Sequence, residues 1–154
     1  MIDSLLVALS ETVAEIAETM LFVEVGVGPL QIQGDPCAAD VSAVVGYSGG
    51  LNGGLRLGGS LAAALRVGGA LLGELRDAWD QEFEDAFGEM ANMIAGGVQT
   101  RVEGALGSIA MTPPMVVQGR NHQVSGRHSS KWLCRHFEMD GVAFFCEIYF
   151  VVPE

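Results

Sequence analysis

Basic residues are scarce in this chain, where eight Lys and Arg stand against nineteen Asp and Glu and leave a formal net charge of −11. Nucleic acids and anionic membrane surfaces attract clusters of Lys and Arg, so this balance argues against both as partners. A protein partner, or a cationic one, fits the acidic composition better.

Long uninterrupted apolar runs are also missing. No Lys or Arg precedes an apolar run at the amino terminus, and Glu11, Glu15 and Glu18 interrupt the first apolar pattern. The apolar stretch 142–152 is broken by Glu147. Neither a signal peptide nor a membrane span fits these patterns, and we expect a cytoplasmic protein.

Cysteine is rare and unevenly spaced. Cys37, Cys134 and Cys146 are odd in number and lie at irregular intervals, which predicts neither a disulfide framework nor a zinc motif. We expect reduced, buried thiols. If three residues connect the last two strands, Cys134 lies opposite Cys146.

The apolar content supports one core. The chain has 154 residues, of which 49% are hydrophobic, so a single domain over 1–154 needs no disulfide or metal to be stable.

The patterning predicts helices and strands in an α+β arrangement, with long amphipathic helices packed on one mostly antiparallel sheet. A first helix runs from Asp3 to about Met20, with Asp3 or Ser4 as N-cap. Ser60 caps a second helix over 61–73, in which Gly68 and Gly69 indicate close packing against a neighbour. Strands are expected at 21–27, 30–33, 41–48, 51–57, 115–117, 131–139 and 142–152, the last two joined by Asp140-Gly141.

The longest predicted helix begins after Asp77 or Asp80 and continues to about Gly104. At about 100° per residue, one face is apolar. The opposite face carries Asp85, Glu89, Asn92 and Gly96, so two carboxylates and an amide are aligned at i, i+4 and i+7. The residues of the apolar face are Phe83, Phe87, Met90, Ile94 and Val98.

This polar face has two interpretations. Exposed carboxylates usually mark a solvated surface. However, Asn92 is a poor residue for a helix interior, and Gly96 and Gly97 each cost about 1 kcal/mol relative to Ala, which a closely approaching partner would explain. A carboxylate and an amide one turn apart do not form a nucleophile, but they can bind a cation and orient a water.

Other binding sites have weaker support. Asp85, Glu82 and Glu89 offer carboxylates to Mg²⁺ or Ca²⁺, but one helix supplies few converging ligands. The glycine-rich segment 49–54 lacks the Gly-Lys-Ser/Thr ending of a phosphate loop, and turns explain it better. The histidines, at positions 122, 128 and 136, have no zinc-like spacing, so surface or core roles are favoured.

The long helix resembles the motif of the CheC/CheX/FliY chemotaxis phosphatase family, most closely its CheX-like branch. The motif is Asp or Ser, three residues, Glu, two residues, Asn, and a Pro about twenty-two residues later. Asp85, Glu89 and Asn92 match it in type and spacing, and Pro114 follows after twenty-one residues, with Pro113 beside it. Met90-Ala91 stands where many members carry Ile-Gly.

The resemblance implies hydrolysis of the aspartyl phosphate of a phosphorylated CheY-like response regulator. It implies that Asn92 orients the attacking water and that Glu89 pairs with a lysine of the regulator, with Asp85 and Pro114 as further motif residues at the partner-binding surface. Gly96, on the same face of the helix, is expected to leave room for that partner. No cofactor is expected in this chain, because the regulator supplies Mg²⁺. CheC-like members carry two such helices, but here the first helix has Glu18 in place of a second Asn, so one site per chain is expected.

The resemblance also implies a homodimer, as in CheX-like proteins. The alternative function is a non-catalytic adaptor that binds a receiver or motor component through the same acidic helix.

Overall fold

Seven strands form one sheet in the computed structural model, which describes residues 1–32, 35–124 and 130–151. Their order is β1-β6-β7-β3-β2-β4, and β5 also pairs with β2. Each pairing among these strands is antiparallel. The strands are β1 (Val25–Gln31), β2 (Ala39–Gly49), β3 (Gly53–Gly59), β4 (Ile109–Met111), β5 (Met115–His122), β6 (Ser130–Met139) and β7 (Val142–Val151).

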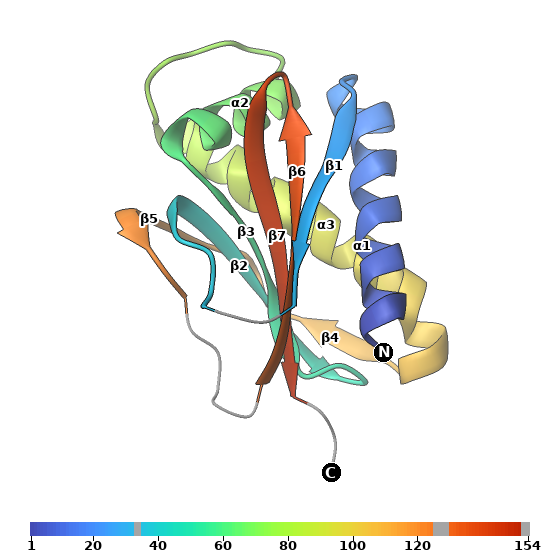
Figure 1. Cartoon of the computed structure of the whole chain (residues 1–154). Helices are drawn as coiled ribbons and strands as arrows, with labels where there is room; N and C mark the ends of the chain where they lie inside the picture. Colours follow the sequence, from blue (N-terminus) through green and yellow to red (C-terminus); the bar gives the residue numbers. More distant parts are fainter. Residues whose placement is uncertain (33–34, 125–129, 152–154) are drawn as a thin grey trace.

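Helices pack on one face of this sheet (Figure 1). They are α1 (Ile2–Ile16), continued by the π-helical turn η1 (Ala17–Leu21), α2 (Leu61–Leu72) and α3 (Gln81–Leu106). The predicted α+β class is therefore confirmed. None of the helices in the described ranges combines the length and apolar character needed to cross a membrane.

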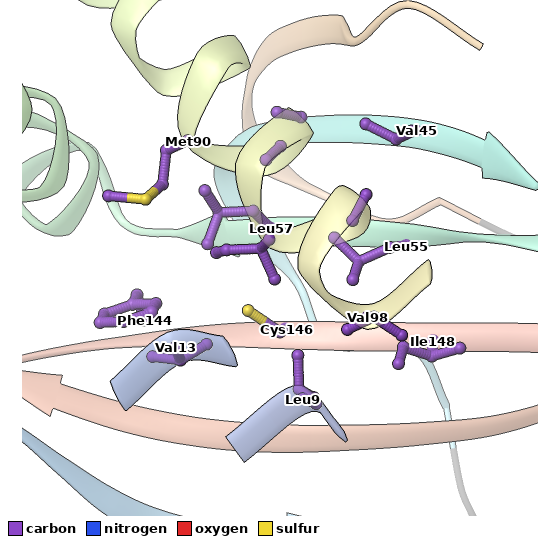
Figure 2. Packing of buried hydrophobic residues seen from close by; sticks show 14 of the residues in the cluster. Leu9, Val13, Val45, Leu55, Leu57, Met90, Val98, Phe144, Cys146 and Ile148 are labelled. Atoms are coloured by element: carbon purple, nitrogen blue, oxygen red, sulfur yellow. The ribbon is translucent and has the colours of Figure 1, made fainter. Parts of the chain in front are cut away.

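The main core lies between the helices and the sheet. Figure 2 shows Leu9 of α1 and Val98 of α3 beside Cys146 and Ile148 of β7. The five residues predicted for the apolar face of α3 are all at most 3% exposed. Burial of this face anchors α3 and leaves its other side free to carry the polar residues.

The N-cap of the first helix and the geometry of its last turn differ from prediction. Its N-cap is Met1, without a side-chain hydrogen bond, so neither Asp3 nor Ser4 caps it. The helix continues through η1 to Leu21, and the strand expected at 21–27 begins only at Val25. A π-helical turn shifts the buried face, and Met20 within this turn is 47% exposed.

The second helix follows its sequence signals. The Ser60 hydroxyl accepts a hydrogen bond from the backbone N–H of Ala63 at 3.1 Å. Gly73 ends the helix in the left-handed conformation at φ 72°. A Cβ atom at Gly68 would lie 2.8 Å from the Phe83 ring, which confirms the close packing expected there.

The strands expected at 41–48 and 51–57 form as β2 and β3, which pair with each other, and β6 and β7 form the hairpin expected at Asp140-Gly141. The register of this second hairpin differs from the one a three-residue turn would give. Asp140 and Gly141, at φ 51° and 79°, make a two-residue turn, which is the tight connection that Asp-Gly favours. Cys134 therefore pairs with Glu147, and Cys146 pairs with Arg135. The expected juxtaposition of Cys134 with Cys146 is wrong by one residue, so the two thiols lie on opposite faces of the sheet.

Candidate functional site

A capped amino terminus fixes the start of α3. The Asp80 carboxylate accepts a hydrogen bond from the backbone N–H of Phe83 at 3.0 Å, so Asp80 rather than Asp77 is the N-cap. Arg76 forms ion pairs with Glu74, Asp80 and Glu82. These contacts order the segment that leads into the helix.

The α3 ridge, defined as Asp85, Glu89, Asn92 and Gly96, lies on the side of the helix away from the core. Asp85 and Glu89 are exposed, whereas Asn92 and Gly96 are half-buried. Gln81 Nε2 donates a hydrogen bond to Asp85 Oδ1 at 2.9 Å. Within the described ranges, the Glu89 and Asn92 side chains have no hydrogen-bond partner, so both remain available to another molecule.

Pro114 lies beside this ridge at the entry to β5. A Cβ atom at Gly88, the residue before Glu89, would lie 3.7 Å from Cβ and Cγ of Pro114 and 3.3 Å from Cγ2 of Val116. Pro114 has no backbone N–H, so it donates no backbone hydrogen bond in the connection between β4 and β5. The fold thus brings Pro114 against α3 next to Glu89, although 24 residues lie between these two in the sequence.

The two glycines after Asn92 have different surroundings. A Cβ atom at Gly96 would meet nothing within 4 Å, whereas one at Gly97 would lie 2.3 Å from Cγ2 of Thr12 in α1. Only Gly96 therefore fits the expectation of a glycine that leaves room for a partner. Gly97 instead permits close packing between α1 and α3.

Hydrogen bonds to the sheet hold α3 just beyond Asn92. The Tyr47 hydroxyl donates to the carbonyl oxygen of Ala95 at 2.8 Å, and Gln99 Nε2 donates to the carbonyl oxygen of Ile109 at 2.6 Å. Burial raises the pKa of Tyr47, which therefore stays a neutral donor. The ridge is consequently displayed on a helix fixed at several points.

The carboxylates do not gather into a cation site. Glu82 is paired with Arg76, and among the residues that the structure describes the one group of potential metal ligands within 4.8 Å of one another is Cys37, Cys134 and His136. Sequence reasoning missed this cluster because Cys37 is 97 residues from Cys134. His128 lies outside the described residues, and His122 Nε2 lies 2.8 Å from the Ser42 hydroxyl.

The first helix does not repeat the arrangement of Glu89 and Asn92. Glu15 forms an ion pair with Arg101 of α3, which also contacts Glu11 at 3.5 Å. Glu18 is exposed and lies in the π-helical turn. Glu15, which corresponds to Glu89 in spacing, is thus already paired within the chain.

A family model described as chemotaxis phosphatase CheX matches residues 41–138, which include all of α3 and Pro114. No curated protein matches the sequence. Among solved structures, a chemotaxis protein CheX from Desulfovibrio desulfuricans is similar, with 26% identity and a TM-score of 0.83, covering 95% of this chain and 98% of that one.

Two further structures share the fold. A chain in the CheX-CheY-BeF3-Mg²⁺ complex from Borrelia burgdorferi is 26% identical with a TM-score of 0.79, covering 98% of this chain and 97% of that one. A CheC-like superfamily protein from Shewanella sp. PV-4 has a TM-score of 0.86 at 24% identity, covering 97% and 98% of the respective chains. Because the family model spans more than half of the sequence, the chain belongs to the chemotaxis phosphatase CheX family.

Proposed function

We propose that this chain hydrolyses the aspartyl phosphate of a CheY-like response regulator, with Asn92 orienting the attacking water and Glu89 pairing with a lysine of the regulator. One observation carries the proposal. Glu89 and Asn92 lie one turn apart on an anchored helix, accessible and without hydrogen-bond partners in the described part of the chain. Side chains held in this way can enter another protein's active site with little loss of conformational freedom.

The chemistry suits an amide. In the proposed step, water attacks the phosphorus atom, a new P–O bond forms, and the bond from phosphorus to the aspartyl oxygen breaks. Inorganic phosphate and the free carboxylate are the products. Asn92 can accept a hydrogen bond from the water and donate another without titrating, so its contribution is orientation rather than proton transfer.

The remaining catalytic groups belong to the partner in this proposal. The regulator supplies Mg²⁺, because the carboxylates of the α3 ridge are not clustered as ligands. The Borrelia burgdorferi relative, crystallised as a CheX-CheY-BeF3-Mg²⁺ complex, supports a regulator as the partner. We also expect a homodimer, which light scattering of the purified chain would test.

The test is single-turnover phosphate release from a phosphorylated receiver domain with Mg²⁺. We expect Asn92→Ala to slow release about 100- to 1000-fold, as removal of one oriented catalytic donor does elsewhere. Glu89→Gln should lower kcat/KM about 10- to 100-fold, because a charge-assisted hydrogen bond contributes about 1.5–3 kcal/mol. Glu18→Gln is the matched control, since Glu18 is an exposed carboxylate on another helix, and it should leave the rate unchanged.

Two results would count against this mechanism. If Asn92→Ala dephosphorylates the receiver as fast as the parent, Asn92 does not orient the water. If the parent binds several receivers without accelerating phosphate release, the chain is an adaptor that uses the α3 ridge only for docking.

A further inference from the structure

Four potential ligands meet on the face of the sheet away from the helices. Cys134 and His136 are two residues apart on β6, so their side chains share one face. Leu133 and Phe137 alternate with them and enter the main core. Gln31 of β1 pairs with Cys134 across the ladder, and Cys37 comes from the segment before β2.

The distances among these groups are short and similar. Cys37 Sγ lies 3.2 Å from Cys134 Sγ, and each sulfur lies 3.8 Å from His136 Nε2. Gln31 Oε1 lies 3.2 Å from Cys37 Sγ and 3.3 Å from His136 Nε2. Two sulfurs, an imidazole nitrogen and an amide oxygen therefore surround one small volume.

A buried ion pair holds Cys37 in this position. Its backbone N–H donates to Glu147 Oε2 at 3.2 Å, and its carbonyl oxygen accepts a hydrogen bond from the Arg56 guanidinium. Arg56 and Glu147 are paired and at most 2% exposed. Glu147 also lies directly across the ladder from Cys134. The main chain at Cys37 is consequently fixed by contacts that do not involve its thiol.

We propose that Cys37, Cys134 and His136 bind a thiophilic divalent cation of the zinc type, with the Gln31 amide oxygen as fourth ligand. Zn–S bonds of about 2.3 Å and Zn–N bonds of about 2.0 Å place tetrahedral neighbours roughly 3.5–3.8 Å apart. The sulfur-to-nitrogen separations need to shorten by about 0.3 Å, and the two sulfurs need to move apart by about 0.6 Å. Thiolate and imidazole ligands select zinc over Mg²⁺ or Ca²⁺, which require oxygen ligands.

Charge and protons balance at this site. Two protonated thiols and a neutral imidazole carry no net charge. Binding replaces two thiol protons with two metal–sulfur bonds and releases these protons to solvent, while imidazole binds through a nitrogen lone pair. A dication with two thiolates leaves the site neutral beside the Arg56–Glu147 pair.

The remaining cysteine provides an internal control. Cys146 lies on β7 in the main core between α1 and α3 (Figure 2), and is fully buried on the opposite face of the sheet. The proposed metal site lies on the face of the sheet away from the helices, whereas the α3 ridge lies on the helical side of the molecule. Metal binding can therefore be tested independently of phosphatase activity.

The test uses the full chain, purified under reducing conditions, stripped with chelator and titrated with Zn²⁺ or Co²⁺. We expect one equivalent of Zn²⁺ to bind, and Co²⁺ to give thiolate-to-metal charge-transfer absorption with tetrahedral d–d bands. Cys37→Ser and His136→Ala should each weaken Zn²⁺ binding at least about 100-fold. Removing a residue that only supports a metal ligand already costs up to about 100-fold, and these two residues are proposed as ligands themselves. Cys146→Ala should bind like the parent.

Three results would overturn the proposal. One is no uptake of Zn²⁺ by a chain whose circular dichroism shows that it is folded. The second is equal binding by Cys37→Ser and the parent. The third is a Cys37–Cys134 disulfide in a chain that binds no metal when reduced. It would be seen as a mass loss of two hydrogen atoms when an added mild oxidant takes up two electrons, and the pair would then be a redox couple.

Discussion

Thr12 of α1 occupies the space that a side chain at Gly97 of α3 would fill, because its Cγ2 lies 2.3 Å from an ideal Cβ at that position. We expect Gly97→Ala to lower the free energy of unfolding by about 1–3 kcal/mol, the usual cost of overpacking, although Ala favours helix. Urea denaturation measures this change.

Thr12→Ser is the compensating change for Gly97→Ala. It removes the clashing methyl group and keeps the hydroxyl, which donates to the carbonyl oxygen of Ala8 at 2.7 Å. The double variant should recover most of the lost stability, so the two changes should be non-additive. A Gly97→Ala variant as stable as the parent would show that α1 and α3 do not approach this closely.

Gly96, one position earlier, should respond in the opposite way. Nothing lies within 4 Å of a Cβ atom there, so Gly96→Ala should leave stability unchanged or raise it by up to about 1 kcal/mol. Gly96→Leu should lower kcat/KM on a phosphorylated receiver at least about tenfold, equivalent to about 1.4 kcal/mol, because its side chain obstructs docking beside Asn92.

Gly104 is the matched control for Gly96, since it lies on the same helix and a Cβ atom there also meets nothing within 4 Å. Gly104→Leu should retain parental kcat/KM. Equal activity of Gly96→Leu and Gly104→Leu would mean that the partner does not approach the helix at Gly96.

Glu147 is expected to be a strong determinant of stability. It is paired with Arg56, and both residues are at most 2% exposed. Glu147→Gln leaves the guanidinium charge buried without its counter-ion, which costs about 3–5 kcal/mol in comparable buried pairs. Thermal and urea unfolding should show this loss, whereas Glu138→Ala, at an exposed carboxylate on the same hairpin, should change stability by less than about 0.5 kcal/mol.

Local signals in the sequence predict much of this fold. Ser60 and Asp80 cap their helices because their side chains accept nearby backbone hydrogen bonds, and Asp140-Gly141 forms its turn because both residues tolerate positive φ. The polar face of α3 follows from helical periodicity alone. Each of these features depends on residues close together in the chain.

Features that depend on distant contacts or uncommon geometry are not predictable in this way. The π-helical turn at Ala17–Leu21 has no clear sequence signature, so the sequence does not predict its geometry, and the strand expected from position 21 begins only at Val25. A three-residue turn would place Cys134 opposite Cys146, but the two-residue turn pairs Cys134 with Glu147. Cys37 reaches Cys134 and His136 only through the packing of the sheet.

The difference between α1 and α3 gives the last prediction. Glu15 and Glu18 have the spacing of Glu89 and Asn92, so Glu18→Asn would reproduce the pair of side chains on the first helix. We nevertheless expect no second active site. Glu15 is held by Arg101, and the π-helical turn that contains Glu18 changes its angle relative to Glu15.

The experiment combines Glu18→Asn with Asn92→Ala and measures phosphate release from a phosphorylated receiver. The double variant should be as slow as Asn92→Ala alone. Recovery of activity would show that spacing in the sequence is sufficient for a site, even without an unpaired carboxylate on a regular α-helix.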